Sequence, residues 1–507
     1  MHPGLDLFME LCYNRTFPVI EWFMFEISQK QGKKEVISAI FIIVFAAIFV
    51  VSNLFLGFSL PVYLATMLMA AGIAFFYPLS GVWAVIFLTV VFERFFTLQS
   101  IFWGRNEWKL YPIDLILGAV ILGTIFQMLN GKIKWQFKKP DWLVIGFAVL
   151  AIAYFFLSVG VLGGDMAVSF SSAKNYAFYP LVYFLVWLLA NSQEKIKKTL
   201  QFVMAGAVAI IAFISYGIIN GGGLWTEFTP LSTEGVRILA FSHAFYLGLA
   251  LIGSLAAYLG GEWKNKTWFL ILSAIWAVGV IGSLMRHLWI ALAVALVFLL
   301  ALATREQRQK TGKLIAAYVV VIIGIAMTIF YFSLMLPRSA IHEAVSGVTS
   351  AVEQRASSLT GNSEDESFLW RATVWKEALR EYSKSPVLGI GFGQAVFIEI
   401  GRYWDLVEVR NVHNSPLVIF VQMGLAGLGL FGWLGWTFAQ MAWKQARRDW
   451  VSFALLGALI YYGVAFLFQP YLEANLLGIF FWIILGLIRA QGKLSEQAKP
   501  YENTRNQ

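Results

Sequence analysis

The chain has 507 residues, of which 59% are hydrophobic and 13% charged, whereas an ordinary soluble domain carries about 25% charged residues. Apolar stretches of about 18 residues or more recur along the whole length, and each is long enough to cross a bilayer. This excludes a soluble domain and predicts an all-α polytopic integral membrane protein. The net charge of +9 does not indicate nucleic acid, because the basic residues form short clusters between apolar spans, as in cytoplasmic loops.

In chain order, the apolar spans and basic clusters predict about fourteen transmembrane helices with both termini cytoplasmic. An even number of spans lies between successive basic clusters, so all clusters share one side of the membrane. We expect the spans at residues 36–57, 60–78, 80–98, 111–130, 141–161, 175–191, 199–219, 238–259, 267–284, 287–304, 314–336, 414–442, 450–469 and 473–489.

These spans divide the chain into five parts. They are a cytoplasmic or interfacial segment at 1–35, transmembrane helices 1–11 at 36–336, a large extracytoplasmic loop at 337–412, transmembrane helices 12–14 at 413–489, and a disordered cytoplasmic tail at 490–507.

The large loop carries an amphipathic helix over residues 362–386. Its apolar stripe is expected to pack on the membrane domain, with lipid contact as the alternative, and consists of Phe368, Leu369, Ala372, Trp375, Leu379 and Tyr382. The glycine-rich string VLGIGFG follows at 387–393. A nucleotide site would need a preceding strand in a βαβ unit, so we interpret these glycines as permitting a tight return of the chain to the bilayer.

Several cationic residues fall on the predicted outer side: Lys174, Arg237, Arg286, Arg371 and Arg410. Each could be a snorkelling or salt-bridged residue, because a cation in an apolar region is costly unless paired. This explanation is weakest for Arg286, which has largely apolar flanks and no carboxylate nearby in sequence. Several arginines on one side suit a diphosphate, since guanidinium groups bind phosphate oxygens in bidentate fashion.

His413 stands three residues after Arg410, where the outer loop meets the next apolar span. If that helix begins early, the two side chains lie about one turn apart. A neutral imidazole can remove a proton from a hydroxyl near pH 7; the alternative is a capping or interfacial histidine. The chain has one cysteine and neither an HExxH nor a CxxC motif, so we predict no metal site and no cofactor.

The order of these motifs resembles the O-antigen ligase/O-antigen polymerase-like superfamily of membrane glycan transferases. The outer loop contains R-x3-W-x2-A-L and P-x-x-G-x-G-F-G, and its end contains H-N followed by G-L-x-G-L-x-L-F. The matching residues are Arg371, Trp375, Ala378, Leu379, Pro386, Gly389, Gly391, Phe392, Gly393, His413, Asn414, Gly424, Leu425, Gly427, Leu428, Leu430 and Phe431. Ser283 and Arg286 are similar to the family's Ser-Arg opening of an apolar helix.

The resemblance implies a metal-independent glycosyltransferase of the bacterial inner membrane. Such an enzyme moves a glycan from an undecaprenyl-diphosphate-linked donor to an acceptor hydroxyl on the extracytoplasmic face, as a ligase or polymerase. The implied roles are diphosphate binding by Arg237, Arg286 and Arg410, assistance to the acceptor by His413, and donor or acceptor contacts by Lys174, Arg371, Trp375 and Asn414.

The acceptor and the class of function stay open at this point. The acceptor could be a growing glycan or other lipid-linked sugar, a lipid A core, or a protein side chain. A transporter or flippase of lipid-linked glycans is the main alternative function, for which charges along a membrane path and internal repeats are expected. A structural scaffold or receptor is the third possible class of function, and it gives no reason for the ordered arginines and histidine.

Overall fold

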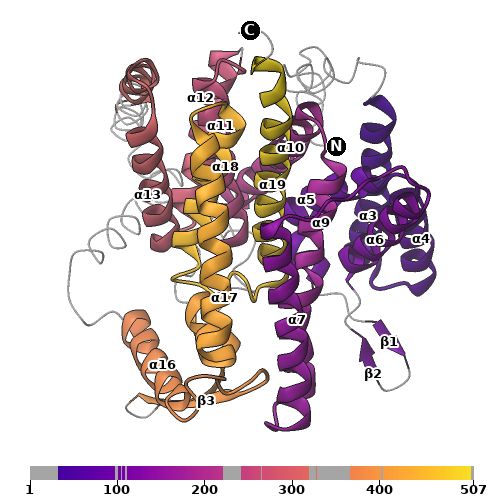
Figure 1. Ribbon diagram of the computed structural model, residues 1–507, viewed down its shortest axis with the longest axis vertical. Helices are drawn as coiled ribbons and strands as arrows, with labels where there is room; N and C mark the ends of the chain where they lie inside the picture. Colours follow the sequence, from indigo (N-terminus) through magenta and orange to yellow (C-terminus); the bar gives the residue numbers. More distant parts are fainter. Residues whose placement is uncertain are drawn as a thin grey trace.

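Helices dominate the computed structural model, which describes residues 32–97, 101–103, 106–108, 111–220, 241–263, 265–318, 327, 366–400 and 403–503 (Figure 1). Within these residues, six helices are long and apolar enough to cross a membrane, and further apolar helices are shorter. This confirms a mostly helical polytopic membrane protein. The number of fourteen spans stays a prediction.

The first half of the chain forms a series of apolar helices, several of which begin with proline, a residue suited to the first helical turn. Their bounds are α3 (Lys33–Leu56), α4 (Leu60–Phe76), α5 (Pro78–Thr97), α6 (Pro112–Leu129), α7 (Lys139–Gly160), α8 (Met166–Ala173), the π-helix η1 (Lys174–Phe178), α9 (Pro180–Leu189) and α10 (Gln193–Asn220).

The second half continues this series and adds an outer helix. Its elements are α11 (Phe241–Leu259), α12 (Lys266–Gly282), α13 (Arg286–Leu302), α16 (Glu366–Tyr382), the 3-10 helix η2 (Val409–Asn411), α17 (Ser415–Ala446), α18 (Trp450–Ala465) and α19 (Asn475–Asn503). Side-chain caps start several of them, because an Asn or Asp oxygen accepts from a free N–H of the first turn. Asn265 caps α12 in this way, and Asp449 caps α18.

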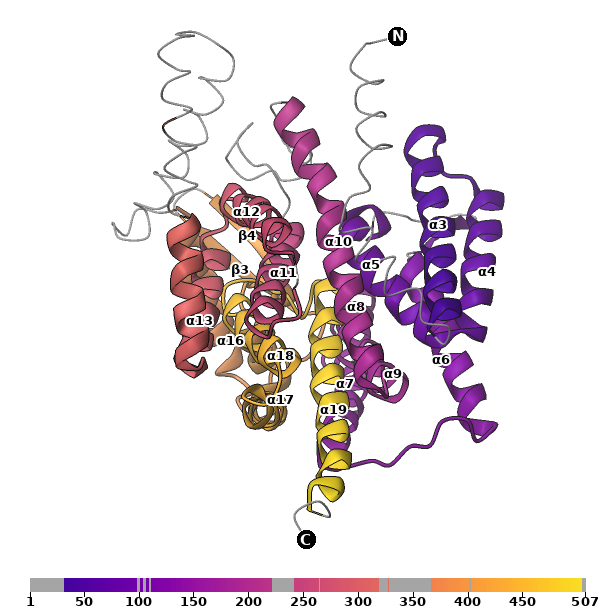
Figure 2. The same ribbon diagram turned by 90° about the horizontal axis from the view of Figure 1, so that it is seen from above.

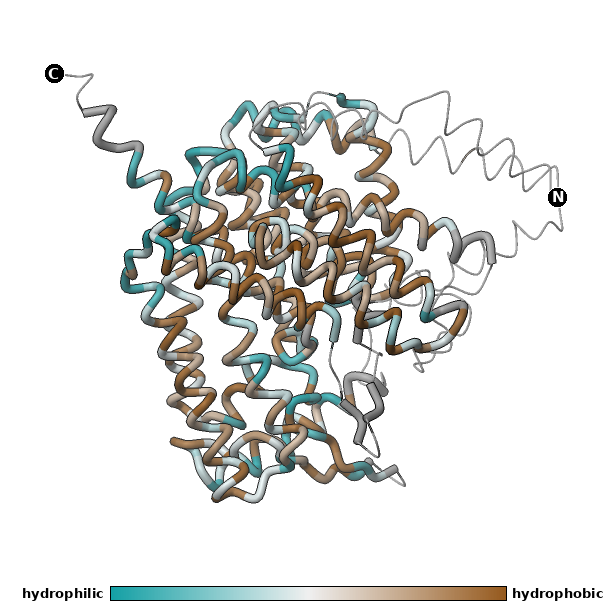
Figure 3. The backbone as a smooth tube through the Cα atoms, turned by 90° about the vertical axis from the view of Figure 1, so that its right-hand side faces the viewer, coloured by the Kyte–Doolittle hydropathy of each residue, from teal (hydrophilic) through white to brown (hydrophobic). Residues whose placement is uncertain are grey.

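The helices form two groups, with three further helices between them. α3, α4 and α6 lie on one side, α11, α12, α13 and α18 lie on the other, and α9, α10 and α19 run between them (Figures 1 and 2). Hydrophobic residues follow the helices through the body of the molecule (Figure 3). The end of α19 and the elements α16 and β3 lie at opposite ends of the molecule (Figure 1); we call the end with α16 the outer end.

Two short β-hairpins correct the all-α prediction. β1 (Ile101–Trp103) pairs with β2 (Asn106–Trp108), and β3 (Ala395–Ile400) pairs with β4 (Tyr403–Glu408), both antiparallel. In β3 the side chains alternate, so that Val396 and Ile398 are buried while Phe397 is exposed, as expected for a half-buried strand. The predicted extracytoplasmic loop therefore holds a hairpin as well as a helix.

Two helical predictions also differ in detail. On α16 the buried residues are Val374 and Ala378, whereas Leu369 and Leu379 of the predicted stripe are exposed; the buried face is rotated because the hairpin packs there. Helix α19 runs to Asn503, into the segment for which the composition predicted disorder.

Helix α17 is interrupted at Gly424, whose φ of 63° and ψ of −161° are not helical. The N–H of Ser415 donates to the carbonyl of Phe466 at 3.0 Å, and the ring of Phe431 lies 6.2 Å from the ring of Phe466. A straight helix would hold residues 415 and 431 about 24 Å apart, too far for both to meet one phenylalanine. α17 therefore turns back at Gly424, and the predicted span 414–442 is not one straight helix.

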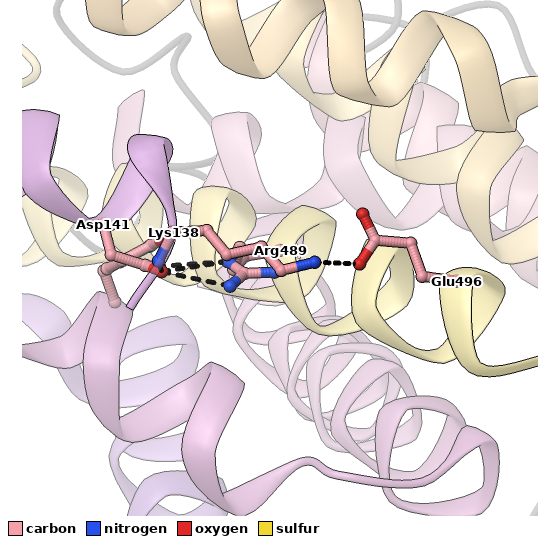
Figure 4. Close-up of polar contacts among 5 residues, drawn as sticks. Lys138, Asp141, Arg489 and Glu496 are labelled. Atoms are coloured by element: carbon pink, nitrogen blue, oxygen red, sulfur yellow. Dashed lines mark hydrogen bonds and ion pairs between the residues drawn. The ribbon is translucent and has the colours of Figure 1, made fainter. Parts of the chain in front are cut away.

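A buried ion pair joins α7 to α19. The Arg489 guanidinium donates to both carboxylate oxygens of Asp141 at 3.0–3.3 Å, and both side chains are at most 3% exposed (Figure 4). Tyr183 of α9 donates to the same carboxylate at 2.5 Å. Lys138 and Glu496 form a second, exposed ion pair beside it. These contacts fix three helices that are far apart in sequence.

Candidate functional site

The connection between α18 and α19, residues 466–474, contacts the elements that carry the predicted site. Its Gln469 makes a side-chain hydrogen bond with His413. The Tyr471 hydroxyl lies 2.8 Å from Nε2 of His287, the residue after Arg286. The connection therefore contacts both His413 and the first turn of α13, the helix that Arg286 begins.

His413 has an unusual backbone and a partly buried ring. Its φ is 58°, a left-handed conformation that is disfavoured for any residue with a Cβ. The ring meets the edge of Trp370 at 5.1 Å between centroids. One ring nitrogen of His413, Nδ1, is buried without a hydrogen-bond partner in the described part of the chain.

The electrostatic surroundings of His413 favour the neutral imidazole. Burial and then the positive charge of Arg371 lower the pKa of His413 to about 4, and the hydrogen bond with Gln469 opposes this shift. The ring is therefore uncharged at neutral pH and can accept a proton. Arg371 is partly buried on α16, so the predicted contact residue and the predicted base are neighbours.

Trp375 acts on the backbone beside the histidine. Its indole Nε1 donates to the carbonyl of Val412 at 2.7 Å. Asn414 is the N-cap of α17, and its side-chain oxygen accepts from Leu417 N at 3.0 Å. Both residues were predicted to contact donor or acceptor; in the structure their polar side-chain atoms are used to shape the turn around His413.

Arg286 begins α13 directly after the sharp turn that the short spacing of spans nine and ten required. Leu284 has a φ of 56°, and the Ser283 hydroxyl donates to the carbonyl of Val280 at 2.7 Å. The turn thus brings Arg286 to a helix N-terminus, where the helix dipole also favours an anion. Arg237 lies outside the described residues.

Two further predicted cations, Arg410 and Lys174, also have partners within the protein. Arg410 donates to Glu408 at 2.5 Å and to the Ser171 hydroxyl of α8 at 2.8 Å. It belongs to η2, and α17 begins only at Ser415, so the expected helical turn between Arg410 and His413 is absent. Lys174 forms an ion pair with Asp114 of α6.

The glycine string follows a tight path beside the break in α17. Gly389, Gly391 and Gly393 all have positive φ values of 70–86°. A Cβ on Gly389 would come within 2.6 Å of the Gln422 backbone. Ile390 N donates to the carbonyl of Val421 at 2.9 Å, so the string occupies backbone groups that the break at Gly424 leaves without helical partners. The glycines thus follow a tight path, as predicted, but the chain continues into β3 and β4 before the next apolar helix rather than returning directly to the bilayer.

Sequence reasoning missed the connection itself. Gln469, Tyr471 and Glu473 stand in FQPYLEAN (468–475), a short polar string between two apolar spans. Its polarity on the predicted outer side was the available signal. Within the described part of the chain, no group of three or more His, Cys, Asp and Glu side chains is arranged to hold a metal ion.

The fold and the site together define a polytopic membrane protein with a neutral histidine and nearby arginines toward one end of its helical bundle. Residues 268–432 match the family described as O-antigen ligase, which confirms the resemblance to the O-antigen ligase superfamily. The match includes Arg286, Arg371, Arg410 and His413, and it supports an O-antigen ligase-type glycan transferase. No protein with a curated description matches the chain.

Proposed function

We propose that the protein transfers a glycan from an undecaprenyl-diphosphate-linked donor to an acceptor hydroxyl on the extracytoplasmic face, as an O-antigen ligase or polysaccharide polymerase, without a metal ion. The environment of His413 is the observation that supports this most strongly. A neutral imidazole with a ring nitrogen that lacks a hydrogen-bond partner among the described residues, close to Arg371 and within the region that matches the family, suits removal of a proton from a hydroxyl.

In the proposed reaction, the acceptor oxygen attacks the anomeric carbon of the donor sugar. The bond between that carbon and the diphosphate oxygen breaks, and the undecaprenyl diphosphate leaves with the electron pair. The acceptor proton moves to His413. Arg286, together with Arg237 and Arg410, binds the diphosphate and stabilises the charge that develops on it.

Donor binding also prepares the base. The positive charge of Arg371 disfavours the imidazolium form of His413. A diphosphate bound nearby offsets that charge, which raises the pKa of His413 in the donor complex. The histidine then accepts a proton more readily when donor is present than when the site is empty.

Transfer by purified, reconstituted protein with a lipid-linked glycan donor and candidate acceptors tests this function. We expect His413→Ala to lower transfer by about 10²–10⁴-fold, the usual contribution of a general base, with donor binding and thermal stability nearly intact. A capping histidine would instead lower stability by about 1 kcal/mol and leave specific activity almost unchanged. Movement of the donor across the vesicle membrane without transfer would favour the flippase alternative.

A further inference from the structure

Glu473 is a buried carboxylate at the junction of three elements. It is 8% exposed and lies in the connection between α18 and α19. Its two carboxylate oxygens accept hydrogen bonds from the hydroxyls of Ser415, the first residue of α17, and Tyr176 of η1. Its backbone carbonyl accepts from the Asn175 side chain at 2.7 Å. A carboxylate in this position is costly unless its oxygens are satisfied.

Ser415 is bound to the connection at several atoms. Its N–H donates to the carbonyl of Phe466 at 3.0 Å. Its hydroxyl donates to Glu473 and accepts from Leu472 N at 3.2 Å. The start of α17 is therefore fixed to residues that immediately precede α19.

The same contacts bear on the strained turn at His413. A left-handed backbone at a residue with a Cβ persists only where its surroundings hold it. Before His413, Trp375 holds the carbonyl of Val412; after it, Ser415 is held by Glu473. The turn from Val412 to Ser415 thus has an anchor on each side.

We propose that Glu473 is a positioning residue for His413, acting through the Ser415 hydroxyl. This inference rests on the proposed role of His413 as the base. In its carboxylate form Glu473 accepts from both hydroxyls at once. A glutamine at this position has one acceptor oxygen, so one of the two hydroxyls loses its acceptor or must reverse its hydrogen bond.

The two donors to Glu473 make a matched pair of tests. Ser415→Ala and Tyr176→Phe each remove one hydroxyl from the same carboxylate, but only Ser415 belongs to the turn that carries His413. A general stabilising role predicts equal effects of the two substitutions. A positioning role predicts a loss of transfer for Ser415→Ala alone.

The experiment measures kcat, donor KM and thermal stability on the full chain in vesicles for Ser415→Ala, Ser415→Thr, Tyr176→Phe, Glu473→Gln and His413→Ala. We expect Ser415→Ala and Glu473→Gln to lower kcat by about 10–100-fold, with donor KM changed less than about threefold. Tyr176→Phe should keep kcat within about threefold, and Ser415→Thr, which retains a hydroxyl, should restore most of it. The Ser415→Ala/Glu473→Gln double variant should be no slower than Glu473→Gln, because both act through one hydrogen bond.

Two outcomes overturn the positioning role. One is normal kcat in Ser415→Ala while His413→Ala is inactive; the other is an equal fall in kcat for Tyr176→Phe and Ser415→Ala. In both cases the function proposed for His413 survives. Normal transfer by His413→Ala removes the role of His413 as the base, whatever the Ser415 variants show, whereas absence of transfer by the wild-type protein removes the proposed function itself.

Discussion

Two buried carboxylates in different parts of the bundle are stabilised in different ways. Asp141 accepts from the Arg489 guanidinium, the Tyr183 hydroxyl and the Lys138 N–H, so a full positive charge balances it. Glu473 accepts from two neutral hydroxyls, and among the described residues no cation pairs with it. The comparison teaches that an ion pair saturated with hydrogen bonds joins helices, whereas the carboxylate beside the histidine turn is held by hydroxyl groups that belong to neighbouring elements.

The largest effect expected from this comparison follows from breaking the Asp141 pair. Arg489→Met leaves a buried carboxylate without its counter-charge, which typically costs about 3–5 kcal/mol. Thermal unfolding of the purified protein measures this loss, and transfer per folded molecule should stay close to normal. A loss below about 1 kcal/mol would contradict the idea that this pair holds α7 to α19.

In the candidate site, Arg286→Ala should weaken donor binding by about tenfold or more, because charge-assisted hydrogen bonds contribute about 1.5–3 kcal/mol each. The donor affinity of Arg286→Lys should lie between those of the wild type and Arg286→Ala, since lysine keeps the charge but lacks the planar guanidinium group. Titration of purified protein with lipid-linked diphosphate measures the affinity. Unchanged affinity in the alanine variant would remove Arg286 from the donor site.

The pH dependence of transfer sharpens the contrast further. Because the pKa of His413 is lowered to about 4 in the free protein, kcat/KM should stay constant as pH falls and decline only near pH 4. The acidic decline of kcat should occur at a higher pH than that of kcat/KM, because bound diphosphate favours the imidazolium form of His413. Removing a positive charge raises the pKa, so Arg371→Gln should move the kcat/KM limb upward, toward 6.5. Identical limbs in wild type and Arg371→Gln would contradict the coupling.

The smallest effect is expected at the exposed ion pair next to Asp141. Lys138 and Glu496 have side chains 50% and 56% exposed, and exposed pairs contribute little because water and salt screen them. Glu496→Gln should change thermal stability by less than about 0.5 kcal/mol. This variant is the matched control for Arg489→Met. An equal loss of thermal stability in both would show that the buried pair contributes no more than the exposed pair.

The part of the site that sequence could predict was the part written in short motifs. The order of Arg371, the glycine string and His413 indicated the family because each motif is local. The Ser283–Arg286 turn was predictable as well, since two spans with no room between them force a reversal. The partner of Lys174 was not, because Asp114 lies 60 positions away and no local pattern links the two.

The hairpin of β3 and β4 had a strand signal in the sequence, but the helical character of the rest of the chain outweighed it. AVFIEI and YWDLVE are rich in the β-branched and aromatic residues that favour strands, yet they stand in a chain whose long apolar segments are helical. The reversal at Gly424 was hidden for a similar reason: a glycine inside a long apolar run is compatible with a straight span. Its non-helical backbone depends on the glycine string, which lies more than thirty residues earlier.

The sequence by itself determined that this chain is a polytopic membrane protein and which family its outer motifs resemble, because lengths of apolar runs and short motifs are local properties. Only the tertiary structure decided what each polar group contacts. Gln469, Tyr471 and Glu473 meet residues 56 to 297 positions away. Such contacts arise only when the helices pack, because packing brings together residues that are far apart in the sequence.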